Sequence, residues 1–78
     1  MKIGKHFRML TMYERLLEGK VINCSMAATE FEVDERSIQR DISDLNAYLG
    51  DRMAFEGGPD VYIEYSKDKQ GYIIVKEV

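Results

Sequence analysis

Residues 33–45, VDERSIQRDISDL, carry two periodic patterns on one short segment. Apolar side chains recur at the spacing of one helix face, at Ile38, Ile42 and Leu45. Arg36 and Arg40 lie four residues apart on a second face, and Asp34 stands in front, where its carboxylate can accept hydrogen bonds from the first turn of a helix. The stretch therefore predicts a helix that begins after Asp34, with arginines that are either ordinary surface charges or contacts to DNA.

This helix is expected to run from residue 35 to 49, with Leu49 as its last buried side chain and Gly50 as its end. Upstream, residues 5–18 place apolar side chains three and four positions apart with no Gly or Pro among them, which predicts an amphipathic helix. Those side chains are Phe7, Leu10, Tyr13, Leu16 and Leu17, with Met9 alongside. Small residues within 25–31 predict a short second helix, joined to the third by a brief turn.

The composition changes after Gly50. Residues 51–60 include Gly57, Gly58 and Pro59 and are expected to form a loop, with room for a short strand at Met53–Phe55. Residues 61–65 and 72–76 are rich in β-branched and aromatic side chains on either side of SKDKQG, which predicts a hairpin.

Pairing Tyr65 with Tyr72 and Ile63 with Ile74 in this hairpin gives it two different faces. The face expected to cover the helices holds Val61, Ile63, Tyr65, Tyr72 and Ile74. Three helices followed by a hairpin predict an α+β fold of one domain, residues 1–78: a winged helix-turn-helix, which is a three-helix bundle followed by a β-hairpin wing.

Bulk composition fits a small soluble protein. The 78 residues are 45% hydrophobic and 32% charged, and Arg8 and Glu14 interrupt any apolar run near the start, so neither a signal peptide nor a membrane span is expected. The single cysteine, Cys24, rules out an internal disulfide and favours a reducing cytoplasm. One His and one Cys leave no set of ligands for a structural zinc ion, and no cofactor is expected.

Catalysis is not expected either. His6, the only histidine, has no Ser or Cys placed to act as its nucleophile, and Cys24 has no base nearby in the sequence. A chain of this length is also too small for a substantial pocket.

The net charge of −3 argues against DNA binding, because neutralisation of phosphates supplies most of the affinity of a DNA-binding protein. The charge is uneven, at +3 in residues 1–20, −4 in 21–49 and −2 in 50–78. A DNA-binding protein of this composition would have to concentrate its basic side chains on one face.

The helix phase supplies such a face. If Ile38, Ile42 and Leu45 are buried, the exposed flanks carry Arg36, Gln39, Arg40 and Ser43, and Ser37 lies in the first turn. Arg and Gln can address base edges in the major groove, and Ser can address phosphates. Lys67 and Lys69 at the hairpin tip could reach phosphates beside the groove.

An alternative remains open from spacing alone. The same residues could make a plain surface helix in which Asp44 pairs with Arg40, or Arg36 with Asp41. Asp41 is unfavourable for DNA binding because phosphate repels a carboxylate, unless a neighbouring arginine pairs with it.

Residues 27–49, AATEFEVDERSIQRDISDLNAYL, resemble the helix-turn-helix of the WYL-domain transcriptional regulators, and more broadly the DeoR-type winged helices. The matching positions are Ala28, Phe31, Val33, Arg36, Ile38, Arg40, Asp41, Ile42 and Leu45. RLLEGKVIN (15–23) and YSKDKQGYII (65–74) also resemble the end of that family's first helix and its wing.

The resemblance implies sequence-specific binding of double-stranded DNA by a bacterial or phage regulator, as a homodimer on an inverted repeat. It places the DNA contacts at Arg36, Ser37, Gln39 and Arg40 and the phosphate contacts of the wing at Lys67 and Lys69. Two departures stand out: the cap is Asp34 where the family more often has Ser, and the chain ends at Val78, so the effector-sensing domain of such regulators, with its firm dimer contacts, is expected to be absent.

A competing hypothesis is a winged helix that binds another protein and no DNA. Its basis is the acidic composition and an apolar outer hairpin face at Tyr62, Ile73 and Val75.

Overall fold

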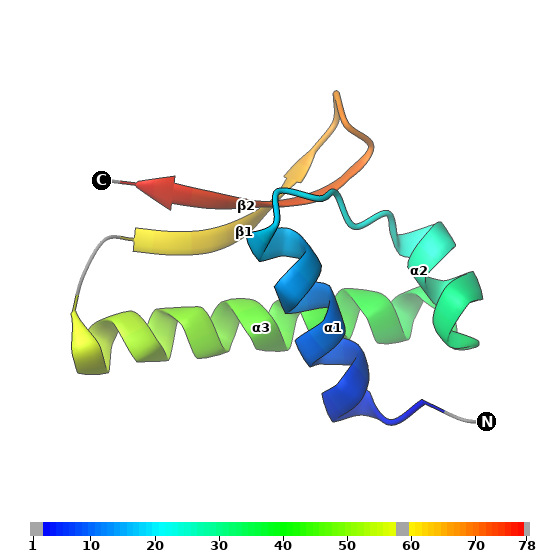
Figure 1. Ribbon diagram of the computed structural model, residues 1–78, viewed down its shortest axis with the longest axis horizontal. Coiled ribbons are helices and arrows are strands. Elements are labelled where there is room, and N and C mark those ends of the chain that lie inside the picture. The colour runs from blue at the N-terminus through cyan, green and yellow to red at the C-terminus, as the bar shows by residue number, and fades with distance from the viewer. Residues whose placement is uncertain (1–2, 58–59, 78) are drawn as a thin grey trace.

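The computed structural model describes residues 3–57 and 60–77. It is an α+β structure of three helices followed by a two-stranded antiparallel hairpin, as shown in Figure 1. The elements in chain order are α1 (Lys5–Leu17), α2 (Cys24–Phe31), α3 (Glu35–Glu56), β1 (Asp60–Ser66) and β2 (Gly71–Glu77). None of these helices is both long enough and apolar enough to cross a membrane.

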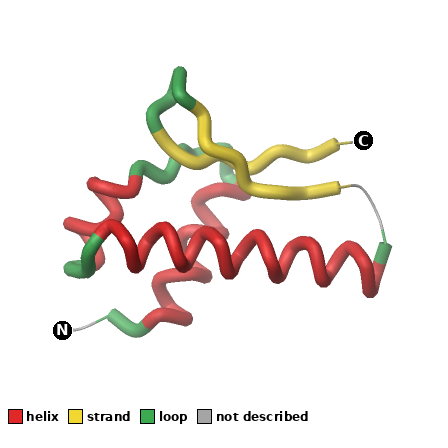
Figure 2. The backbone as a smooth tube through the Cα atoms, turned by 180° about the vertical axis from the view of Figure 1, so that it is seen from behind, coloured by secondary structure: helices red, strands yellow, loops and turns green. Residues whose placement is uncertain are grey.

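The longest helix, α3, forms the base on which the other elements pack. Helix α1 crosses it, α2 lies at its N-terminal end, and the hairpin runs along it, as Figures 1 and 2 show from opposite sides. The core where they meet consists of Met12, Leu16, Ile22, Ala27, Ala28, Phe31, Ile38, Ile42, Leu45, Leu49 and Ile63. The apolar stripe predicted for the third helix is therefore confirmed.

Helix α3 is longer than the sequence pattern predicted. Gly50 was expected to end it, but the helix continues to Glu56 and ends at Gly57, whose φ of +77° suits glycine. Gly50 lies at an exposed helical position, and beyond it Arg52 bonds Glu56 one turn later at 3.1 Å. The predicted strand at Met53–Phe55 is wrong, and the predicted loop over 51–60 is wrong for residues 51–56, which are helical, and for Asp60, which begins β1. Gly57 lies after the helix, and Gly58 and Pro59 lie outside the described residues.

Helix α1 is present as predicted but presents a different face to the core. The buried side chains are Arg8, Met12 and Leu16, one turn apart, whereas Phe7 and Leu10 from the predicted stripe are exposed. Because Arg8 is buried, the face of α1 that contacts the core differs from the face that the apolar residues alone predict.

The register of the hairpin is as predicted, with Tyr65 opposite Tyr72 and Ile63 opposite Ile74. Ile63 is buried, and Val61, Tyr72 and Ile74 pack against the core. Tyr65 was expected on the covered face but is largely exposed, because the tip of the hairpin extends past the helices (Figure 1). Its ring meets Tyr72 edge to face at 5.3 Å.

Polar contacts made by Asn46 and Ile22 attach the two strands of the hairpin to the rest of the molecule. The amide side chain of Asn46 accepts from the backbone N–H of Ile63 at 2.7 Å and donates to its carbonyl at 2.9 Å. Ile22, in the segment between α1 and α2, exchanges two backbone hydrogen bonds with Tyr72, at 2.9 and 2.7 Å. Neither contact follows from periodicity.

We expect Gly71→Ala to destabilise the fold, because the Ile22–Tyr72 contact brings two backbones together at Gly71. An added Cβ would lie 2.5 Å from Cγ1 of Val21 and 2.6 Å from the carbonyl oxygen of Ile22. The free energy of unfolding should fall by about 1–3 kcal/mol in urea denaturation. Gly50→Ala is the matched control, since its Cβ meets nothing within 4 Å; it should add roughly 0.5–1 kcal/mol. Equal effects of the two changes would contradict the close approach at Gly71.

Candidate nucleic-acid interface

The first turns of α3 present a polar face opposite the core. The side chain of Asp34 caps the helix by accepting from the backbone N–H of Ser37 at 2.8 Å, as predicted. Because the helix buries Ile38 and Ile42, the predicted contact residues Arg36, Gln39, Arg40 and Ser43 are all exposed, and Ser37 is half-buried.

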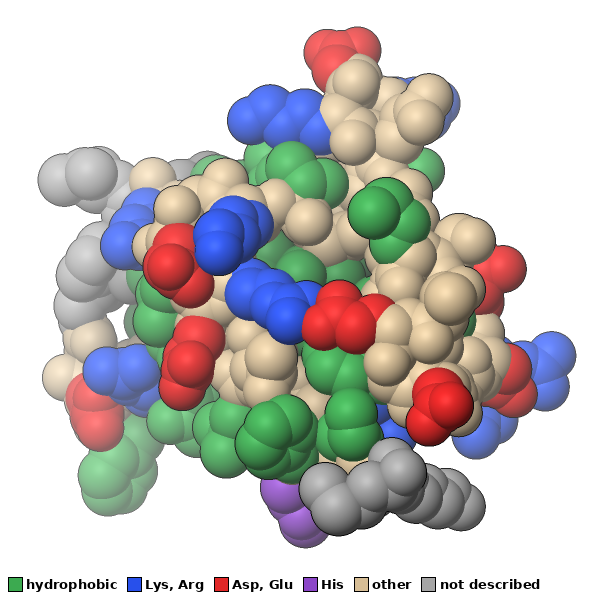
Figure 3. Space-filling model, turned by 45° about the vertical axis from the view of Figure 1, so that its right-hand side comes forward, with side chains coloured by type: hydrophobic (Ala, Val, Ile, Leu, Met, Phe, Trp, Pro, Cys, Tyr) green, Lys and Arg blue, Asp and Glu red, His purple; other side chains and the backbone are tan. Residues whose placement is uncertain are grey.

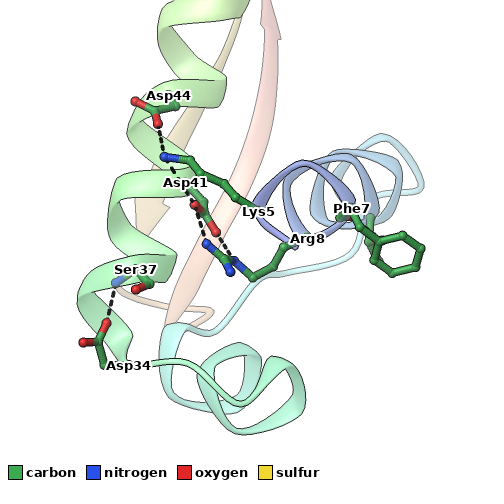
Figure 4. A network of polar contacts seen from close by, with 8 residues as sticks. Lys5, Phe7, Arg8, Asp34, Ser37, Asp41 and Asp44 are labelled. Atoms are coloured by element: carbon green, nitrogen blue, oxygen red, sulfur yellow. Dashed lines mark hydrogen bonds and ion pairs between the residues drawn. The ribbon is translucent and has the colours of Figure 1, made fainter. Parts of the chain in front are cut away.

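Asp41 does not belong to this exposed face. Its side chain is only 1% exposed and lies between α1 and α3, where Arg8 binds it with two hydrogen bonds, Nε–Oδ2 at 2.5 Å and Nη2–Oδ1 at 3.1 Å. Figure 4 shows the Arg8 guanidinium pointing across from α1 to this carboxylate. A carboxylate that would repel phosphate is thus turned inward and neutralised.

Asp44, one turn further along α3, also binds α1. Its carboxylate meets the ammonium of Lys5 at 2.7 Å, and the same ammonium lies 4.0 Å from Asp41 (Figure 4). The surface pairs of the plain-helix alternative, Asp44 with Arg40 or Arg36 with Asp41, are therefore not formed. Both aspartates bind basic side chains of α1. Arg36 and Arg40 are therefore not neutralised by either of them.

The pKa shifts at this site follow the same contacts. The hydrogen bond to Asp41 raises the pKa of Arg8, although burial acts against it. The pKa of Asp34 is lowered, first by the backbone N–H of Ser37 and also by the charges of Arg36 and Arg40. The cap is therefore ionised at neutral pH, and the stability it contributes is lost only as the pH falls through that lowered pKa.

The hairpin tip carries the two predicted lysines, Lys67 and Lys69, both exposed. The hydroxyl of Ser66 accepts from the backbone N–H of Lys69 at 3.3 Å, and Gln70 takes a positive φ of 55°. The side chain of Asn23 donates to the carbonyl of Gln70 at 2.9 Å while it also caps α2. One amide thus connects the tip to the start of α2.

The tip and the start of α3 lie in the same half of the molecule along its long axis, with the tip extending away from the helices (Figures 1 and 2). A polar cleft of about 280 Å³ runs between them. Its lining comes from α2, α3 and the hairpin: Asn23, Cys24, Ser25, Glu35, Gln39, Tyr65, Gln70 and Tyr72. The start of α3 and the hairpin tip, which carry the two predicted groups of basic residues, therefore border the same cleft.

Ion pairing separates the basic side chains into two groups. Those paired with an acid are Lys5, Arg8, Arg15, Lys20 and Arg52. Between described residues no ion pair involves Arg36, Arg40, Lys67, Lys69 or Lys76. The tip appears at the top of Figure 3 with basic side chains around an acidic one. Four of these five unpaired basic residues are at the candidate interface.

His6 and Cys24 are the two side chains that were considered as catalytic groups from the sequence. His6 is exposed, and burial, with the charge of Glu35, raises the pKa of the Cys24 thiol, which opposes formation of a thiolate. No three His, Cys, Asp or Glu side chains in residues 3–57 and 60–77 are placed to hold a metal ion. An open groove of about 400 Å³ does lie between α1, the end of α3 and the hairpin, so the expectation that the chain lacks a substantial pocket needs this correction.

Comparison of the chain with known protein families, with curated proteins and with solved structures gave no match. The residues that sequence reasoning missed are Arg8 as the partner of Asp41, and Asn23 and Asn46 as attachments of the hairpin. The signal for Arg8 was its place in the stripe with Met12 and Leu16, which a search for apolar residues passes over.

Asp41→Asn should destabilise the fold by about 3 kcal/mol in urea denaturation, because it leaves the buried guanidinium of Arg8 without an opposite charge. The matched control is Asp44→Asn on the same helix, which removes a pair whose two side chains are about half exposed; it should cost less than about 1 kcal/mol. If the two variants are equally stable, the Arg8–Asp41 pair does not hold α1 on α3.

Proposed function

We propose that this chain is a winged helix-turn-helix domain that binds double-stranded DNA, as part of a transcriptional regulator of the kind that its sequence resembles. The observation that carries the proposal is the gathering of unpaired basic side chains at the start of α3 and at the hairpin tip. In this proposal α3 enters the major groove and the hairpin acts as a wing on the backbone.

The exposed face of α3 has the chemistry that groove recognition needs. Arg36, Gln39 and Arg40 carry the donors and acceptors that pair with base edges, and arginine binds guanine with two hydrogen bonds. Ser37 and Ser43 offer hydroxyls to phosphates, which position the helix without reading sequence. The turn between α2 and α3 is short, and Glu32 takes a left-handed conformation in it (φ 57°, ψ 45°). Two helices joined by so short a turn are what the helix-turn-helix arrangement consists of.

The acidic composition predicts weak binding by one copy. Neutralisation of phosphates by Arg36, Arg40, Lys67 and Lys69 would give a slope of roughly −3 to −4 in a plot of log affinity against log salt. Two copies on an inverted repeat would raise the affinity, because the second half-site contact becomes effectively intramolecular. The first experiment is a gel-shift titration with the DNA upstream of the chain's own gene, repeated at several salt concentrations.

The alternative function, binding of another protein without DNA, also has an observation in its favour. Apolar side chains lie exposed on α1, at Phe7, Leu10 and Leu17. The outer hairpin face at Tyr62, Ile73 and Val75 is instead half-buried. Association through apolar side chains would change little with salt, whereas DNA binding should weaken steeply. Absence of any salt-sensitive DNA binding would favour the alternative.

Arg40→Ala should weaken binding to a specific site by about 1–3 kcal/mol if the arginine contacts a base, and should relax the preference at one base pair. Fluorescence anisotropy with labelled duplexes measures both effects. Arg52→Ala is the matched control, because Arg52 is an exposed arginine on the same helix, paired with Glu56 far from the interface. The same affinity for both variants would remove Arg40 from the interface.

Replacing Lys67 and Lys69 together with alanine should lower affinity for all DNA sequences alike, since the tip is assigned to phosphates. The salt slope should become shallower by up to about two units. Lys76→Ala is the control, being another exposed lysine of the hairpin without an ion pair between described residues, but away from the tip. A changed base preference in the double variant would mean that the wing reads bases.

A further inference from the structure

Helix α1 presents an apolar face to solvent on the side away from α3. Phe7, Leu10 and Leu17 are 63%, 61% and 45% exposed, although the helix has Met12 and Leu16 fully buried on its other side. Figure 4 shows Phe7 pointing away from α3 and from the polar contacts between the helices. Hydrophobic side chains also form a band along the lower edge of the face seen in Figure 3. An exposed apolar stripe of this kind marks an interaction surface.

The spacing along this face is that of a helix that packs against another helix. Ile3, just before α1, and Leu10 and Leu17 within it are seven residues apart. Phe7 and Tyr13 lie on either side of Leu10. Ile3 and Tyr13 form the border of this face, because both are partly buried against the core and the Tyr13 hydroxyl accepts from Arg52 of α3 at 3.5 Å. Apolar residues repeating every seven positions keep one seam facing a partner helix.

We propose that the partner is a second copy of this chain, whose α1 packs antiparallel on the first across a two-fold axis at Leu10. In this register position i of one copy faces position 20 − i of the other. Leu10 then meets itself, and the exposed Leu17 and Phe7 meet the parts of Ile3 and Tyr13 that the core leaves uncovered, so that each apolar residue faces an apolar residue. A two-fold interface requires a surface that is complementary to itself. The surface that binds a different protein does not need this property.

The charged side chains of α1 are compatible with this register. Arg8 and Arg15 are bonded to acids of other helices, and Lys5 is bonded to Asp44. Glu14 has no ion pair between described residues, and in the antiparallel register it faces His6 of the second copy. Antiparallel helices also place the positive end of one dipole beside the negative end of the other.

A second copy on α1 leaves the candidate interface free, because α1 packs on α3 through its opposite face, with Arg8 and Met12. The contact is small, since one pair of short helices buries less than the roughly 800 Å² per partner of a standard interface. We therefore expect a weak dimer, with a dissociation constant of about 10–100 μM. This proposal differs from the sequence expectation that firm dimer contacts lie outside the chain, and it stands whether or not the chain binds DNA.

The test is the mass of the 78-residue chain by sedimentation equilibrium, between low micromolar and millimolar concentration. The mass should rise from 9.1 kDa towards twice that value. Leu10→Glu should raise the dissociation constant at least tenfold with an unchanged circular dichroism spectrum. Met26→Glu is the control, because Met26 is an apolar residue of α2 that is 73% exposed and outside the face; this variant should associate like the parent. A chain that stays monomeric at 1 mM, or equal association of the two variants, would overturn the proposal.

Cysteine cross-linking tests the register. In a Cys24→Ser background, Leu10→Cys should form a disulfide-linked dimer quickly under mild oxidation, because the two copies of residue 10 lie on the axis. Glu14→Cys alone should react slowly, but a mixture of Glu14→Cys and His6→Cys chains should cross-link readily. Equal reactivity of Leu10→Cys and Met26→Cys would show random collision and overturn the antiparallel packing.

Discussion

The ion pair between Arg8 and Asp41 is the contact on which the arrangement of the helices depends. It lies between α1 and α3, and Arg8 shares its face of α1 with Met12 and Leu16, so it determines which side of that helix is buried. Breaking a buried pair of charges leaves an uncompensated charge, which disfavours any packing of α1 that separates Arg8 from Asp41. Two features follow from this packing of α1. Asp41 is removed from the exposed face of α3, and Phe7 and Leu10 of α1 are exposed to solvent.

The position of the hairpin depends on a second set of contacts, made by backbone and amide groups. Asn46 holds Ile63 on α3, and the Ile22–Tyr72 backbone contact holds the second strand beside the segment before α2. Asn23 then connects the tip to the start of α2. These contacts are directional, so they place the basic tip beside the cleft that the first turns of α3 also line. A hairpin held only by apolar packing would have more freedom to slide along the helix.

Much of the secondary structure and the exposed polar face of α3 could be predicted from the sequence, because they follow from local patterns. The cap at Asp34 and the stripe of Ile38 and Ile42 determine which way the arginines point. The remaining features depend on partners far apart in the chain. Arg8 and Asp41 are 33 positions apart, so no window of sequence shows that one neutralises the other. Gly50 resembled a helix end, but the helix continues beyond it to Gly57.

Chemical-shift mapping by NMR tests most directly the proposal that this acidic chain binds DNA through the start of α3 and the hairpin tip. An isotope-labelled sample titrated at low salt with a short duplex of arbitrary sequence needs no knowledge of the operator, because phosphate contacts are independent of sequence. The account predicts that backbone amide shifts change at residues 34–43 and 66–70, and that added salt reverses the changes. Shift changes confined to α1 or to the C-terminal half of α3, or none at all, would contradict it.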